Sequence, residues 1–308
     1  MIATTRTAII SLLTCAILVG GCKTLDTISD YSTKALVATG TISSSQATSI
    51  NKSVSAVGKT FDSFTPEQEY FVGRTVAAVI LSKNKAYDKI SATRYLNRLG
   101  QVLALFSERP ETFGGYHFLI MDSEEINAFA APGGLILVSR GMLRCCQTED
   151  ELAAVLAHEI AHVAQKHGLQ AIQKSRVTSA LTILGTEAVK NLAGGQLDEL
   201  TKNFEDSVSD IISTTVNNGY ARELEESADT AAIKTLQAVG YDPRALVSML
   251  RQMQKRLNPS GKDFNKTHPK PEDRIVVIEK LINSSAPATP SQAAPARQER
   301  FKDAIGSV

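Results

Sequence analysis

The chain has 308 residues, of which 43% are hydrophobic and 21% charged, and 33 Lys and Arg against 32 Asp and Glu give a formal net charge of +1. This length allows one large domain or two small ones, and the composition excludes disorder throughout. The near-neutral charge argues against a protein that follows a nucleic-acid backbone. The four cysteines, Cys15, Cys22, Cys145 and Cys146, show no C-x-x-C spacing. Any metal therefore has to use histidine and carboxylate ligands.

Residues 1–21 predict an export signal. Arg6 precedes an apolar run over 7–21, and these 15 residues are fewer than the roughly 20 that a membrane-spanning helix needs. The run Val19-Gly20-Gly21-Cys22 resembles a bacterial lipobox, so we expect a lipoprotein signal peptide, cleavage before Cys22 and lipidation of that residue. An ordinary signal peptide with an incidental cysteine is the alternative. Lys23 favours a periplasm-facing lipoprotein of the outer membrane rather than the inner one.

Two further segments are expected to lie outside the main domain. Residues 22–64 combine a Ser/Thr-rich tether with an amphipathic helix over 50–64, in which large apolar residues recur at helical spacing. Residues 284–308 begin with a stretch rich in Ala, Pro and Ser that cannot bury enough surface to fold. We expect a flexible C-terminal tail there, with a docking peptide over 297–305 as the alternative.

Residues 65–283 then form the main domain, predicted to be α+β and mainly helical. Thr65, Pro66 and Gln68 have the spacing of a capping box with proline at the first helical position. A second helix is expected over 93–106. Buried strands are expected over 116–121 and 135–138, separated by turn residues, so the β-sheet is small.

One helix, expected over about 148–168, carries a pattern typical of metal chemistry. It contains His158-Glu159-Ile160-Ala161-His162. Positions four apart on a helix differ by only about 40°, so both imidazoles can reach one ion. Glu159 lies beside the first histidine, where its carboxylate can reach a metal-bound water. This is the H-E-x-x-H zinc arrangement, and two surface histidines that flank a glutamate by chance are the alternative.

A catalytic zinc site needs a third protein ligand. His167 follows His162 by five residues, so in a continuous helix it points away by about 140°. The acidic segment 220–229 offers a carboxylate instead: Glu225 can coordinate while Asp229, four residues later, orients a histidine. Spacing alone does not separate Glu225 from the neighbouring glutamates at 223 and 226, and a solvated acidic face is the alternative.

Four motifs together resemble the zinc metalloendopeptidases of the HtpX/BepA type, a gluzincin family. They are Asn127-Ala-Phe-Ala-Ala-Pro-Gly-Gly134, the H-E-x-x-H segment, Glu225-x-x-Ala-Asp229 and Thr267-His268-Pro269, and they extend over most of residues 65–282. The resemblance implies a zincin-like metalloprotease fold with a small sheet beside the active-site helix, one zinc ion per chain and peptide-bond hydrolysis. It also implies that Glu225 is the third ligand with Asp229 as its neighbour, and that the protein acts in quality control of cell-envelope proteins.

The expected mechanism uses Glu159 as the base that takes a proton from water and returns it to the leaving amine. The substrate is expected to pair in extended form with the strand around 127–131 or 135–139. The alternative is that Asn127 and the glycines at 133 and 134 form only a turn. The resemblance places His268 and Arg274 near the cleft, where His268 could touch metal or substrate and Arg274 could stabilise an oxyanion. The alternative for His268 is a loop residue without a role at the metal, and the alternative for Arg274 is a structural ion pair. Residues 169–219 are expected to cover the site as a helix pair or as a mobile lid.

Two functions follow. The first is a lipid-anchored zinc endopeptidase that hydrolyses misfolded or unassembled envelope proteins, with the outer-membrane assembly machinery as a possible partner. The second is a periplasmic chaperone or peptide-binding module that keeps zinc but seldom cleaves. A structural lipoprotein with an accidental motif is a third reading.

Overall fold

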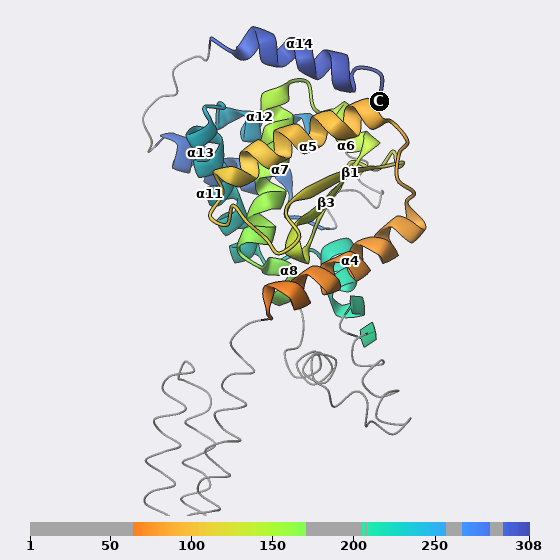
Figure 1. The fold of residues 1–308 in the computed structure, drawn as a ribbon. Helices are drawn as coiled ribbons and strands as arrows, with labels where there is room; N and C mark the ends of the chain where they lie inside the picture. The colour runs from red at the N-terminus through yellow and green to blue at the C-terminus, as the bar shows by residue number, and fades with distance from the viewer. Residues whose placement is uncertain (1–63, 171–204, 207, 257–266, 284–291) are drawn as a thin grey trace, which may run out of the picture. The chain divides into compact units, whose positions relative to one another are not determined.

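The computed structural model describes residues 64–170, 205–206, 208–256, 267–283 and 292–308 (Figure 1). The expected signal peptide, the lipidated Cys22, the tether and helix over 22–64, and most of the expected lid lie outside these residues. The residues from Thr65 to Val308 belong to one unit. No helix within the described residues has the length and hydropathy needed to span a bilayer.

Helix α4 (Pro66–Lys83) begins at the predicted capping box. The Thr65 hydroxyl accepts from the Gln68 amide, and the Gln68 side chain accepts from the Thr65 amide in return. This helix lies against the turn η1 (Pro132–Gly134), where a Cβ at Gly73 would stand 1.7 Å from the Pro132 carbonyl oxygen. Only glycine fits at this contact. The prediction of this helix start is confirmed.

Three short strands form the mixed sheet. Strands β1 (His117–Met121) and β3 (Leu135–Ser139) are parallel, while β2 (Ala128–Ala131) pairs antiparallel with β3. The order β1-β3-β2 makes β3 central and β2 an edge within the described sheet. Of the two strands expected to pair with a substrate, β3 already has partners on both sides, so the expectation is restricted to β2.

Helices pack around this sheet and around one central helix, α7 (Glu149–Ala164) (Figure 1). Nearly every residue of α7 is buried, because strand β2 and the helices α5 (Ile90–Leu105), α11 (Arg222–Val239) and α12 (Arg244–Arg256) all contact it. The remaining elements are α6 (Arg140–Cys145), α8 (His167–Gln170), the π-helix η3 (Ser213–Asn218), α13 (Pro271–Asn283) and α14 (Ala294–Ile305). The fold is therefore the mainly helical α+β architecture that the sequence predicts.

The active-site helix is shorter than the sequence predicts. Its start is as predicted, since the Thr148 hydroxyl accepts from the amide of Glu151 at 3.1 Å. Its end is at Ala164, because Lys166 adopts a left-handed backbone with φ 57°. Gly168, expected to stop the helix, instead lies inside the short α8 that follows the break.

The C-terminal segment differs from the flexible tail expected over 284–308. Residues 294–305 form α14, whose Phe301 and Ile305 are 6% and 4% exposed and belong to the main hydrophobic core. Arg300 pairs with the buried carboxylate of Glu149, which also accepts from the hydroxyls of Tyr95 and Tyr241. Over 297–305 the structure therefore agrees with the docking peptide, which the sequence analysis gave as the alternative. Residues 284–291 lie outside the described residues.

Candidate metal centre and active site

Helix α7 directs two imidazoles to one point. His158 and His162 are 2% and 1% exposed, and their Nε2 atoms are 3.1 Å apart. They are four positions apart on the helix, so both side chains leave the same face, as the sequence predicts.

The carboxylate comes from the first turn of α11, which packs closely along α7. Glu225 places Oε2 3.5 Å from Nε2 of His158 and Oε1 3.5 Å from Nε2 of His162. Glu225 is buried, whereas Glu223 and Glu226 are exposed. The structure thus brings only one of the three candidate glutamates to the histidines.

These distances fit a metal ion. A tetrahedral zinc with bonds of about 2.0–2.1 Å separates its ligands by about 3.3 Å, close to the 3.1, 3.5 and 3.5 Å observed. Both Glu225 oxygens are buried and have no hydrogen-bond donor among the described residues. Ligand atoms of His158, His162, Glu225 and His268 all lie within 4.8 Å of one another. The donor set therefore suits a divalent ion held by nitrogen and oxygen.

The local charge is compatible with a cation. Among the described residues, three buried carboxylates, those of Glu159, Glu225 and Asp229, lie near one buried guanidinium, that of Arg274. In the metal-free chain a proton on His158, whose pKa is raised to about 9, offsets part of this negative charge. A divalent ion bound to the neutral imidazole would take the place of that proton.

Glu159 lies beside this cluster and is 2% exposed. Its Oε1 is 3.9 Å from Nε2 of His268. Burial, assisted by the charge of Glu225 and opposed by His158 and Arg274, raises the pKa of Glu159 to about 7. A carboxyl group with this pKa can both accept and donate a proton near neutral pH.

Asp229 and Arg274 hold the outer side of His158. Asp229 Oδ1 is 2.9 Å from Nδ1 of His158, and Arg274 donates to both Asp229 oxygens, at 2.6 and 3.0 Å. Burial would raise the pKa of Asp229, but Arg274 and His158 lower it to about 2. Burial and Arg274 would lower the pKa of His158, yet Asp229 and Glu225 raise it to about 9. Arg274 therefore forms the ion pair that the sequence left as an alternative to an oxyanion contact.

His162 has a different surrounding, which corrects one prediction. His167 does not point away: its Nδ1 lies 2.9 Å from Nδ1 of His162. The helix break at Lys166 is the reason, since it turns His167 back toward the preceding turn. Burial lowers the pKa of His167 to about 4 and that of His162 well below its usual value, so both rings are neutral at pH 7.

Asn127 occupies the start of the edge strand rather than the metal cluster. Its Oδ1 accepts from the Ala128 amide at 2.9 Å and from the Thr267 hydroxyl at 3.4 Å. Thr267 in turn contacts Nδ1 of His268 at 2.9 Å. Asn127 thus connects β2 to the segment that carries His268.

Two further residues escaped the sequence analysis. Tyr220 stacks on the His162 ring, with centroids 4.4 Å apart and an interplanar angle of 21°. Its hydroxyl is 3.4 Å from that of Thr215 in the π-helix η3. The sequence carries no signal for Tyr220, because a single tyrosine before an acidic helix is common. For His167 there was a signal: if α7 ended before it, the 140° argument for a continuous helix would no longer apply.

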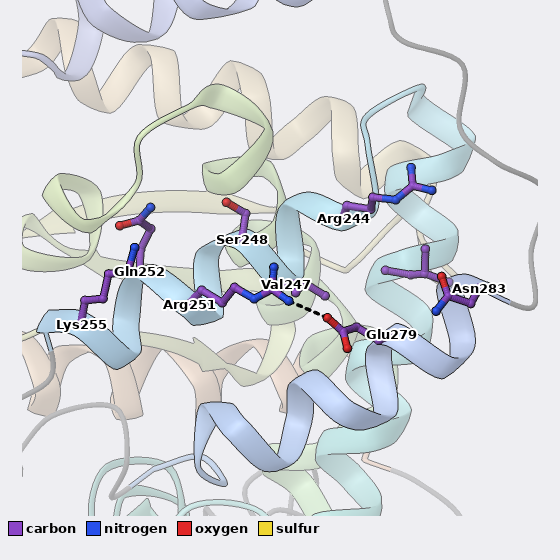
Figure 2. A pocket seen from close by; sticks show the side chains of 9 residues that line it. Arg244, Val247, Ser248, Arg251, Gln252, Lys255, Glu279 and Asn283 are labelled. Atoms are coloured by element: carbon purple, nitrogen blue, oxygen red, sulfur yellow. Dashed lines mark hydrogen bonds and ion pairs between the residues drawn. The ribbon is translucent and has the colours of Figure 1, made fainter.

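A separate hollow lies on the outer side of α12 and α13 (Figure 2). It has a volume of about 440 Å³ and is lined by Arg244, Arg251 and Lys255, with Glu279 paired to Arg251 at 2.7 Å. The opposite face of α12, which carries Met249 and Met253, contacts the region of His158 and Glu159. The basic hollow is therefore not part of the metal cluster.

The fold and the site together define a class. A buried helix with H-E-x-x-H and a glutamate that a following helix brings to its two histidines have the pattern of a metallopeptidase. Comparison with known proteins agrees, because residues 91–282 match peptidase family M48. The chain belongs to this family.

Several curated relatives support the assignment. The beta-barrel assembly-enhancing protease of Escherichia coli (strain K12) is 31% identical over 201 residues, which cover 63% of this chain and 40% of that protein. The protein of the same name from Yersinia pestis is 31% identical over 207 residues, covering 65% and 41%. Mitochondrial metalloendopeptidase OMA1 of Schizosaccharomyces pombe is 32% identical over 158 residues, covering 51% and 43%. The match spans about two fifths of the length of these relatives.

Proposed function

We propose that the chain is a zinc-dependent endopeptidase that hydrolyses misfolded or unassembled proteins of the bacterial cell envelope. The observation that carries the proposal is the triangle of ligand atoms from His158, His162 and Glu225, with Glu159 beside it. Its sides of 3.1, 3.5 and 3.5 Å match a tetrahedral zinc site. The two 3.5 Å sides are long for hydrogen bonds, and a bound ion would give the buried Glu225 carboxylate a partner.

The roles of the residues follow from their positions. His158, His162 and Glu225 are the ligands. Bound zinc would polarise the scissile carbonyl and lower the pKa of a water molecule. Glu159, with its pKa raised to about 7, accepts a proton from the attacking water and passes it to the leaving amine. Asp229 fixes the His158 ring, and Arg274 fixes Asp229.

The edge strand β2 provides a place for the substrate. Its residues Ala128–Ala131 pair with β3 on one side only within the described sheet, and the strand contacts α7. All four residues are buried and η3 also contacts the strand, so binding of a peptide there requires the neighbouring segments to move. An extended peptide that pairs with a strand edge is held by its main chain, whatever its side chains. Such binding suits an enzyme that acts on unfolded chains of many sequences.

The cellular setting rests on the sequence and on the names of relatives. We infer that residues 1–21 are a lipoprotein signal peptide, that Cys22 carries the lipid, and that 22–64 tether the peptidase domain to the periplasmic face of the outer membrane. Two relatives are named as proteases that enhance beta-barrel assembly. Envelope polypeptides, and the machinery that assembles outer-membrane proteins, are accordingly the proposed substrates and partners.

The test is cleavage of a chemically unfolded protein, such as reduced casein, by the zinc-loaded wild-type chain and by its Glu159→Gln variant. Loss of the base should lower the rate by about 100-fold or more while zinc content stays unchanged. Equal cleavage by the two proteins would remove the enzyme proposal. Covalent capture of polypeptides bound to Glu159→Gln in cell envelopes, followed by mass spectrometry, would then identify the substrates.

A second candidate is a zinc-holding peptide-binding module that seldom cleaves. The observation that favours it is His268, which is buried among the ligand atoms and lies 3.8 Å from Glu225 Oε1. A fourth protein ligand would occupy the place that water needs. If this reading holds, His268→Ala should gain cleavage activity; if the enzyme reading holds, it should leave cleavage unchanged or lower it.

A further inference from the structure

The backbone is strained one residue before His167. Lys166 has φ 57°, and it is the only residue other than glycine with positive φ among those that the structure describes. For an L-amino acid other than glycine, this left-handed conformation is unfavourable. Strain of this kind persists where the surrounding structure requires it, and it often marks a functional position.

The consequence of this strain is a contact between two imidazoles. In a continuous helix, residues five apart point about 140° away from each other. The break at Lys166 instead starts α8 in a direction that brings Nδ1 of His167 to 2.9 Å from Nδ1 of His162. Gly168 lies close to the Pro132 ring on this path, since a Cβ there would stand 3.2 Å from it.

The contact fixes which nitrogen of His162 carries the proton. A histidine that binds a metal through Nε2 has its proton on Nδ1. The Nδ1–H of His162 therefore donates, and Nδ1 of His167 accepts, so the proton of His167 is on its own Nε2. Tyr220 covers one face of the His162 ring at the same time. His162 is thus held at its outer nitrogen and on one face, with Nε2 directed at His158 and Glu225.

We propose that His167 is a positioning residue of the metal centre: it accepts a hydrogen bond from Nδ1 of His162 and so holds Nε2 of that ligand toward the metal. The proposal rests on the zinc site of the proposed function. The two histidine ligands then differ in their support, since His158 is held by a carboxylate and His162 by a neutral imidazole.

The first experiment measures zinc affinity of the full chain by competition with a chromophoric chelator at pH 7.5. His167→Leu removes the acceptor and should weaken zinc binding by about 10- to 100-fold. His167→Asn can place an acceptor oxygen where Nδ1 lies, so its affinity should stay within about threefold of wild type. His117→Asn is the matched control: that imidazole is exposed on β1 and contacts the Gly114 carbonyl instead.

The second experiment does not depend on the apolar variant remaining folded. In ¹⁵N-histidine spectra of the zinc-loaded wild-type chain, one imidazole N–H should show a coupling across its hydrogen bond to a second imidazole nitrogen. This coupling should vanish in His167→Asn, while the N–H signal of His162 remains. Its absence from the wild-type spectrum would overturn the proposal.

The outcomes separate this proposal from the one on which it rests. A wild-type chain that binds no zinc would refute both. A wild-type chain that binds zinc, with His167→Leu folded and equal to it in affinity, would refute the role of His167 alone. If His167→Leu does not fold, the comparison is between His167→Asn and His167→Gln, whose longer side chain misplaces the acceptor. Equal zinc affinities of these two variants would refute the role of His167.

Discussion

The docking of α14 leads to a prediction that separates the structure from the expectation of a flexible tail. Phe301 is 6% exposed and belongs to the main core, although only seven residues follow it in the sequence. Truncation of a buried phenylalanine to alanine usually costs about 3–5 kcal/mol. If α14 undocks in the variant, the loss is limited to the free energy of docking, so we expect a value at the lower end, about 3 kcal/mol.

Thermal unfolding followed by circular dichroism provides the assay. For a domain of this size, about 3 kcal/mol lowers the melting temperature by about 6–12 °C. Glu299→Ala is the matched control, because this side chain on the same helix is exposed, and it should change stability by less than about 0.5 kcal/mol. Arg300→Ala should have an intermediate effect, since Glu149 keeps its two tyrosine donors.

A Phe301→Ala variant that melts like the wild-type chain would refute this reasoning and would restore the flexible tail. The result also bears on the site. Glu149 is the first residue of α7, so α14 supports the start of the helix that carries both histidines. Increased cleavage by a protease near residue 291 in Phe301→Ala, but not in Glu299→Ala, would show that undocking is the cause.

Three other substitutions or reactions test separate parts of the account. A Gly→Ala change normally stabilises a helix, but Gly73→Ala should destabilise the fold by about 1–3 kcal/mol, because its Cβ would overlap the Pro132 carbonyl. Urea unfolding measures this change, and a stabilised variant would contradict the contact. Asp229→Asn should weaken zinc binding by about 10-fold or more in chelator competition, since His158 loses its carboxylate partner; unchanged affinity would argue against that role. Burial raises the pKa of Cys145 to about 11 and that of Cys146 well above its usual value. At pH 8 both thiols should therefore react with a disulfide reagent only after denaturation. Fast reaction of the native chain would contradict their burial.

Local rules predicted the parts of the fold that depend on neighbouring residues. The capping box at Thr65 and the Thr148 cap depend only on residues close in sequence, and both helices begin where the sequence predicts. At Thr148 the box is incomplete, because the Glu151 side chain accepts from the Gln147 amide instead of the Thr148 amide. The spacing of His158 and His162 follows from the helical repeat alone, which is why their proximity could be read from sequence.

Features that depend on distant packing could not be predicted in the same way. The choice of Glu225 over its neighbours depends on how α11 lies along α7, and the sequence alone left three glutamates open. The end of α7 at Ala164 depends on a strained lysine that no propensity favours, so His167 was placed on the wrong side. The docking of α14 is likewise decided by the core that it meets.

Zinc content per chain is the most direct test of the proposed centre. Protein purified without chelators and analysed by plasma emission spectrometry should contain close to one zinc per chain. His158→Ala, His162→Ala and Glu225→Ala should each lose most of it, while Glu159→Gln should keep it. Full zinc content in all three ligand variants, or none in the wild-type chain, would contradict the account.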